Sequence, residues 1–178
     1  NLFINFTLKR LTEIFGLIVF ICGLFLLITL LSYSPEDPNF IFPDNIEIKN
    51  LFGFYGSYIS DLFFQSVGII AFLISLSFMI TGINIFINKD FFLLIENTFF
   101  ITLYTLLGSL FFSFFYSNTF TLYINGNGGF VGTYLKSIFL GSLIEKYELI
   151  VYYLLILSIL SCFFISINFH PIKFLLIL

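Results

Sequence analysis

The chain has 178 residues, of which 60% are hydrophobic and only 10% carry a charge. Soluble domains contain about 25% charged residues, so the composition excludes a water-soluble globular fold and indicates a membrane protein. The net charge of -3 is small and spread along the chain, which excludes a basic surface for binding nucleic acid.

The first apolar run covers residues 14–33 and is preceded by Lys9 and Arg10. A run of about 20 apolar residues can cross the bilayer core as a helix. The apolar part of a signal peptide is shorter, about 7 to 15 residues, and ends in small residues, unlike this run. We therefore predict a first transmembrane helix over 14–33. The chain begins with Asn1 rather than Met, so we expect a fragment or a trimmed product.

A polar segment, residues 34–56, follows this helix and contains prolines, glycines and four acidic residues. This composition predicts an aqueous loop without a lasting helix. The second spanning helix is predicted over 60–88. Ser60 and Asp61 are suited to cap its start, because a side-chain oxygen can accept from a free N–H group and a carboxylate favours the positive end of the dipole. A functional role is the alternative for Asp61, since ionisable groups inside membranes are usually functional.

Lys89 and Asp90 form a short turn before the third predicted spanning helix, residues 94–116. A second polar loop, residues 117–146, follows. Its stretch 125–129 alternates Asn and Gly, which favour turns over helix. A phosphate-binding loop is not indicated, because no Lys-Ser/Thr pair follows these glycines.

Residues 130–145 are too short and too mixed in polarity to span a bilayer, so we predict an interfacial or re-entrant helix there. Residues 149–169 form the fourth predicted spanning helix, which ends at His170 and Pro171. His170 is expected at the level of the lipid headgroups rather than in a ligand site. The predicted fold is an all-α, polytopic membrane protein in which residues 1–178 form a single membrane domain.

The orientation follows from the distribution of lysine and arginine, which are retained in the cytoplasm. With the N-terminus inside, four basic residues fall on the inner side and three on the outer side. An even number of helices returns the C-terminus to the cytoplasm. The loops 34–56 and 117–146 are then extracytoplasmic.

Small and hydroxyl residues form stripes on three of the predicted helices, which predicts close helix packing in the bilayer. A solute path lined by Ser and Thr is the alternative, but transport usually needs a buried charge or a broken helix, and neither is evident in the middle of these runs. Both cysteines fall in apolar runs and are expected to be free and packed. The stripes contain Gly68, Ala71, Ser75 and Gly82; Thr98, Thr102, Thr105 and Ser109; and Ser158, Cys162 and Ser166.

Three segments resemble the N-terminal four-helix membrane domain of the FtsK/SpoIIIE septal DNA translocases. They are residues 32–38 after the first helix, residues 50–62 leading into the second helix, and residues 128–132 before the fourth. The resemblance extends over nearly the whole chain. The motif positions, expected to be structural, are Ser34, Pro35, Asp37, Pro38, Gly53, Gly56, Asp61, Gly68, Gly128, Gly129 and Gly132.

The resemblance implies a membrane anchor and assembly module of a cell-division DNA translocase, located in the bacterial inner membrane at the division septum. It implies cell-division proteins as partners and a homo-oligomer, a hexamer in the family. ATP, Mg and DNA would act in a C-terminal motor. These residues contain no Gly-x-x-x-x-Gly-Lys-Ser/Thr motif, so we assign no catalytic, cofactor-binding or metal-binding residue. The alternative function is a small four-helix transporter or channel subunit.

Overall fold

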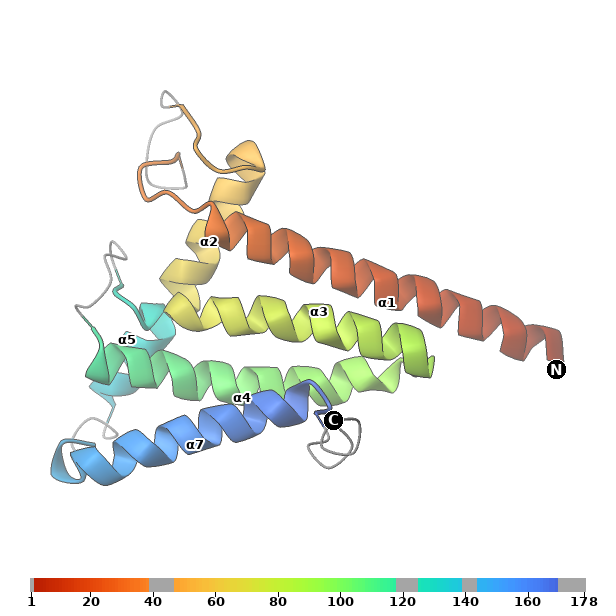
Figure 1. Ribbon diagram of the computed structural model, residues 1–178. Coiled ribbons are helices and arrows are strands. Elements are labelled where there is room, and N and C mark those ends of the chain that lie inside the picture. The colour runs from red at the N-terminus through yellow and green to blue at the C-terminus, as the bar shows by residue number, and fades with distance from the viewer. Residues whose placement is uncertain (1, 39–46, 118–124, 139–143, 170–178) are drawn as a thin grey trace, which may run out of the picture.

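The computed structural model describes residues 2–38, 47–117, 125–138 and 144–169, and its regular secondary structure within these ranges is entirely helical. The predicted all-α fold is therefore confirmed. The predicted position of His170 lies outside the described residues. Figure 1 labels the helices α1 (Leu2–Leu31), α2 (Gly53–Val67), α3 (Ala71–Asn88), α4 (Phe92–Phe115), α5 (Gly129–Ser137) and α7 (Glu148–Ser166). The 3₁₀ turn η1 (Gly68–Ile70) lies between α2 and α3.

The long helices α1, α3, α4 and α7 form a bundle in which α1 packs on α3, α3 packs on α4 and α7, and α4 packs on α7. They run alternately in opposite directions (Figure 1). Consequently α2, α5 and the segments around them gather at one end of the bundle, which we call the loop end. The start of α1, the turn between α3 and α4 and the end of α7 lie toward the other end, which we call the turn end.

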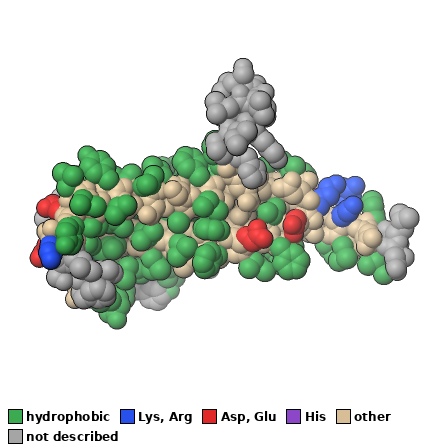
Figure 2. All heavy atoms as spheres, turned by 90° about the horizontal axis from the view of Figure 1, so that it is seen from below, with side chains coloured by type: hydrophobic (Ala, Val, Ile, Leu, Met, Phe, Trp, Pro, Cys, Tyr) green, Lys and Arg blue, Asp and Glu red, His purple; other side chains and the backbone are tan. Residues whose placement is uncertain are grey.

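Among the residues that the structure describes, four helical stretches are long and apolar enough to cross a membrane: Ile4–Leu31, Gly53–Asn88, Phe92–Phe115 and Glu148–Ser166. Large hydrophobic side chains remain exposed along these helices, as contact with lipid requires. Figure 2 shows a broad hydrophobic stretch on one face of the bundle, with charged side chains toward the ends. The predicted polytopic membrane protein with four spanning helices is thus confirmed. The helix predicted before the fourth span is α5; whether it is interfacial or re-entrant stays a prediction.

The second spanning stretch is bent, whereas the sequence predicts one unbroken helix over 60–88. Its break lies at Gly68, whose φ of 74° and ψ of -148° belong to a region that only glycine readily adopts. The turn η1 then leads into α3, and α2 crosses the loop end at a steep angle to α3 (Figure 1). The stretch thus consists of a short helix, α2, and a long helix, α3, joined at a corner.

Helix α1 begins at Leu2, well before residue 14, because charged residues do not stop a helix when they are good helix formers. Arg10 and Glu13 face each other on α1 with 2.6 Å between Nη1 and Oε2. Lys89 lies 3.0 Å from the other oxygen of Glu13. These ion pairs connect α1 with the turn between α3 and α4.

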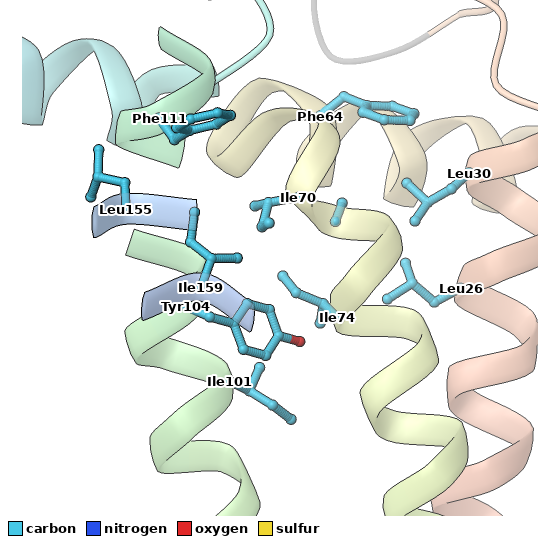
Figure 3. Packing of buried hydrophobic residues seen from close by; sticks show 11 residues of the cluster. Leu26, Leu30, Phe64, Ile70, Ile74, Ile101, Tyr104, Phe111, Leu155 and Ile159 are labelled. Carbon is cyan, nitrogen blue, oxygen red and sulfur yellow. The ribbon is translucent and has the colours of Figure 1, made fainter. Parts of the chain in front are cut away.

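The hydrophobic core runs along the bundle, with α3 between α1 and the pair α4 and α7 (Figure 3). Tyr104 of α4 is fully buried, and its hydroxyl donates to Ser77 Oγ at 2.9 Å. The core residues are Leu26, Leu30, Phe64, Ile70, Ala71, Ile74, Ile101, Tyr104, Phe111, Leu155 and Ile159.

The small residues contribute unequally to helix packing. Gly82 of α3 lies against the backbone of α1, where an added Cβ would come 2.8 Å from Phe20 Cα. Thr105 and Ser109 are buried in α4, as the predicted stripe requires. Thr98 and Thr102 are instead exposed, and their hydroxyls donate to carbonyl oxygens of their own helix. The stripe on α4 is therefore correct only in its second half.

Candidate functional site

The first two motif segments meet at the carboxylate of Asp37, which is only 1% exposed. It accepts hydrogen bonds from the backbone N–H groups of Lys49 and Asn50, each at 2.9 Å. A carboxylate that accepts from buried N–H groups makes strong, directional bonds. The end of the α1 segment is thereby joined to the segment that starts α2.

Asn50 extends this network to the end of α1. Its side-chain amide donates to the carbonyl oxygens of Thr29, at 2.9 Å, and Ser32, at 3.3 Å. The last carbonyls of a helix lack partners within the helix, so Asn50 satisfies groups that would otherwise need water. Gly56 completes the fit, because a Cβ there would overlap Asn50 Oδ1.

The residues around Pro38 close the same network. Asp37 N–H donates to Ser34 O at 3.1 Å, which forms a turn across Pro35. Ser57 of α2 is buried and donates from Oγ to the carbonyl oxygen of Pro38 at 2.9 Å. The motif over residues 34–38 is therefore a tight turn held against α2. We refer to this set of bonds as the Asp37–Asn50 network.

The predicted capping role of Ser60 and Asp61 is wrong, because α2 already begins at Gly53. Gly53 takes a φ of 61°, and Asn50 Oδ1 accepts from the N–H of Phe52 at 3.1 Å just before the helix. Ser60 Oγ donates to carbonyl oxygens within α2 instead.

Asp61 lies inside α2 and is 7% exposed. Its Oδ1 accepts from the hydroxyl of Tyr33 at 3.1 Å and from Gln65 Nε2 at 3.5 Å. Asp61 therefore links the middle of α2 to the residues that follow α1. The hydroxyl of Tyr33 supplies this buried carboxylate with a hydrogen-bond donor at the loop end.

The third motif segment meets the break in the second span. Gly68 lies so close to the carbonyl oxygen of Asn127 that a Cβ would overlap it. The break also frees the N–H of Ile69, which donates to Asn127 O at 3.0 Å. Asn127 is fully buried and its side-chain amide donates to the carbonyl of Tyr116. We call this the Gly68–Asn127 contact.

The glycines that follow Asn127 place α5 directly on neighbouring backbones. A Cβ on Gly129 would lie 2.6 Å from Ser66 O, and one on Gly128 or Gly132 would overlap Ser109 O. Ser109 Oγ in turn donates to Val67 O at 2.9 Å, so α4 also contacts the end of α2. Because these glycines have no side chain, they allow α2, α4 and α5 to lie in direct contact.

One exposed ion pair lies outside the spans at the loop end. Lys49 Nζ is 2.5 Å from Glu36 Oε2. The hydrogen bond from Lys49 and its charge lower the pKa of the Glu36 carboxyl from its ordinary value of 4.5. The same contact raises the pKa of Lys49 above 10.5. The pair therefore joins the two residues that precede Asp37 and Asn50 in the sequence.

The chemistry of these groups is structural. Their polar atoms mostly bond one another or the backbone. Within residues 2–38, 47–117, 125–138 and 144–169, no three His, Cys, Asp or Glu side chains group closely enough to hold a metal ion. Sequence reasoning gave no specific role to Asn50, Ser57 and Asn127, although all three lie in or beside the motif segments.

Known proteins of one family are similar to this chain. A family described as "4TM region of DNA translocase FtsK/SpoIIIE" matches residues 8–175. The chain is 34% identical over 87 residues to the DNA translocase FtsK of Azospirillum brasilense, a match that covers 48% of this chain and 14% of that protein. It is 37% identical over 78 residues to the DNA translocase FtsK of Rickettsia bellii, covering 44% of this chain and 10% of the relative.

These matches cover at most 14% of the length of either relative. No solved structure matches the chain. The family match extends from within α1 to beyond α7 and so includes every motif segment of the loop end. The chain therefore belongs to the FtsK/SpoIIIE family of DNA translocases, as their four-helix membrane region.

Proposed function

We propose that this region anchors a DNA translocase in the bacterial inner (plasma) membrane at the division septum and assembles it with cell-division proteins. The observation that carries the proposal is the combination of four apolar spans with an ordered polar loop end, in a chain that matches the family's membrane region. ATP-driven DNA pumping, with ATP and Mg, would belong to a C-terminal motor. A homo-oligomer, a hexamer in the family, completes the proposal.

The proposed orientation places both termini in the cytoplasm and the loop end outside. Lys9, Arg10 and Lys89 lie toward the turn end, and retention of basic residues in the cytoplasm supports placing that end inside. Single cysteines at Glu47 and Asp90, in a background without Cys22 and Cys162, test this. An impermeant maleimide should label position 47 and spare position 90 in intact cells. The reverse pattern would invert the orientation.

The surface that a division partner can reach does not include the buried residues of the motif segments. Asp37 and Asn50 are buried and engaged within the fold, so a partner cannot reach them directly. Their neighbours Leu51 and Tyr55 are 76% and 75% exposed at the start of α2. We propose that the motif residues shape the loop end and that Leu51 and Tyr55 contact the partner.

A fluorescent fusion of residues 1–178 tests the anchoring role. It should collect at the division site of a suitable bacterial host, and Leu51→Ser with Tyr55→Ser should reduce this enrichment without loss of membrane insertion. Ile4→Ser is the matched control, because Ile4 is an exposed apolar residue, 58% exposed, near the start of α1. Uniform membrane fluorescence of the unchanged fusion would contradict the proposal.

The transporter alternative is not favoured by the break at Gly68. The carbonyl of Asn127 lies directly against Gly68, and Ile69 N–H bonds to it, so backbone fills the corner. Reconstituted vesicles should therefore show no solute uptake. Uptake that is lost when Gly68 is replaced would instead favour transport.

A further inference from the structure

A cavity at the loop end lies between the end of α4 and the start of α7. Its volume is about 530 Å³, and it is open to the surroundings, because Glu148, Leu149 and Tyr153 at its rim are exposed. The two helices lie side by side there (Figure 1). The lining consists of four aromatic side chains, one leucine and one carboxylate: Phe115, Tyr116, Tyr152, Tyr153, Leu149 and Glu148.

The aromatic side chains pack against one another. The hydroxyls of Tyr116 and Tyr152 are 2.9 Å apart and hydrogen bonded. Phe115 packs edge-on against Tyr152 with 5.0 Å between ring centroids, and Tyr153 packs edge-on against Tyr152 at 5.4 Å. Aromatic faces carry partial negative charge, so such a wall attracts cations.

The lining also carries a negative charge, as the aromatic faces do in part. Glu148 supplies a carboxylate, and no lysine or arginine lines the cavity in the described part of the chain. Lys146, two residues before Glu148, lies instead over the ring of Tyr147 at 5.3 Å from its centroid. Lys136 donates to Ser113 O and lies over Phe114. The cavity is therefore suited to a cation and unsuited to an anion.

The position of the cavity relative to the bilayer indicates that the cation belongs to a lipid. The spans of α4 and α7 end and begin at the cavity, which places it near the lipid headgroups. We propose that this cavity binds the ammonium group of a zwitterionic phospholipid such as phosphatidylethanolamine. The ammonium group contacts the Glu148 carboxylate and the aromatic faces, and the acyl chains follow the apolar surface beside Leu149. The proposal does not depend on a septal location.

Binding of short-chain lipids to the purified chain in detergent micelles, followed by native mass spectrometry, tests the headgroup. Short-chain phosphatidylethanolamine should bind, and phosphatidylglycerol with the same chains, which lacks the ammonium group, should bind much more weakly. Ethanolammonium chloride serves as the free cation and should bind more weakly than the lipid. Equal binding of the two lipids, or equal binding of free ethanolammonium and the lipid, would overturn the proposal.

Two substitutions and a control test the residues. Glu148→Gln removes the charge and should weaken phosphatidylethanolamine binding about fivefold. Tyr153→Leu keeps an apolar side chain but removes an aromatic face, and should weaken binding roughly threefold. Glu145→Gln makes the same charge change outside the cavity lining and should leave binding unchanged.

Circular dichroism must show the same helix content and melting behaviour for the three variants, because Glu148 also lies in the first turn of α7, where it favours the helix dipole. If Glu148→Gln bound the lipid as well as the unchanged chain, Glu148 would serve only the helix. If Glu145→Gln weakened binding equally, the binding would depend on the general charge of the surface and not on the cavity. Either result would reject the site.

Discussion

The two ends of the bundle are held together in different ways. At the loop end, backbone lies against backbone: Gly68 meets the Asn127 carbonyl, and α5 lies on Ser109 and Ser66. At the turn end, α1 meets the turn between α3 and α4 through the tips of long side chains, Arg10, Glu13 and Lys89, and backbone lies against backbone only further in, where Gly16 faces Gly82. Asn97 and Thr81 add a side-chain pair at 2.9 Å between α4 and α3.

This difference indicates which end tolerates substitution. A backbone contact cannot move aside when a Cβ is added, because the close-packed interior has no space to receive it. An exposed, flexible side chain such as that of Arg10 can change its rotamer and exchange one partner for water, whereas the buried pair of Asn97 and Thr81 cannot. We therefore expect the backbone contacts of the loop end to be sensitive to single changes and the ion pairs of the turn end to be tolerant.

The largest effect is expected for Gly68→Ala. The new Cβ would overlap Asn127 O, and alanine would be forced to a φ of 74°, so the cost should be about 3 kcal/mol or more of unfolding free energy. Gly53→Ala is the matched control, because Gly53 also has a positive φ of 61° but nothing within 4 Å of an added Cβ. Its cost should be about 1 kcal/mol. Chemical unfolding in detergent micelles measures both; equal costs would show that the Asn127 contact contributes nothing.

The next effect is expected for Asp37→Ala, which removes the acceptor of two backbone N–H groups. These N–H groups of Lys49 and Asn50 would lose their bonds at about 1 to 2 kcal/mol each. Glu36→Gln changes the adjacent, exposed carboxylate and should leave the fold intact. Protease cleavage between residues 47 and 53 should increase only for Asp37→Ala. Equal cleavage of both variants would contradict the Asp37–Asn50 network.

A smaller effect is expected for the pair of Asp61 and Tyr33. Asp61→Asn keeps an acceptor for the Tyr33 hydroxyl and should be tolerated, whereas Asp61→Leu should cost about 1 to 2 kcal/mol. A double-mutant cycle with Tyr33→Phe measures the coupling, which should be about 1 kcal/mol. A coupling of zero would mean that the hydrogen bond contributes nothing. Loss of septal localisation in Asp61→Asn, with unchanged stability, would assign the charge to a partner contact.

Sequence features that depend on length and polarity predicted the membrane fold well. An uncharged run such as 149–169 must be a span because its length matches the bilayer and its backbone must be internally bonded. The motif segments likewise identified the family before any geometry was known. Both kinds of signal are local in the chain.

The details of the loop end were not predictable because they depend on distant partners. Gly53 and Gly56 indicated a loop, but Gly53 starts α2 and Gly56 leaves room for Asn50. Asp61 looked like a cap because its bond to Tyr33 spans 28 residues of sequence. Gly68 looked like a packing residue, since its positive φ is visible only when the Asn127 segment is in place.

At the turn end, Glu13→Gln breaks the pairs with both Arg10 and Lys89. It should lower the melting temperature only slightly, and by less than Gly68→Ala, Asp37→Ala or Asp61→Leu. The difference from the unchanged chain should shrink as salt is raised from 0.05 to about 1 M, because the Debye length then falls to about 3 Å. Light scattering in the same scans checks that salt does not aggregate the micelles. A loss as large as that of Asp37→Ala would contradict the contrast between the ends.

The smallest effect is expected for the exposed pair of Glu36 and Lys49, and it should depend on pH. The pKa of Glu36 is lower in the folded chain than its ordinary value of 4.5, so its contribution is complete above pH 4.5 and is lost as pH falls through the lowered pKa. Lys49 has a raised pKa, so its contribution is complete below pH 10.5 and is lost as pH rises through the raised pKa. The melting temperature of the unchanged chain should therefore exceed that of Glu36→Gln by a small, constant amount near neutral pH, and the two should converge as the pH falls below 4.5 and through the lowered pKa of Glu36. Lys49→Met should give the same profile at low pH, since either change removes the one pair. A difference that does not shrink as the pH falls would show that Glu36 acts through its packing rather than its charge, and the loop end would then depend on surface side chains as well as on its buried backbone contacts.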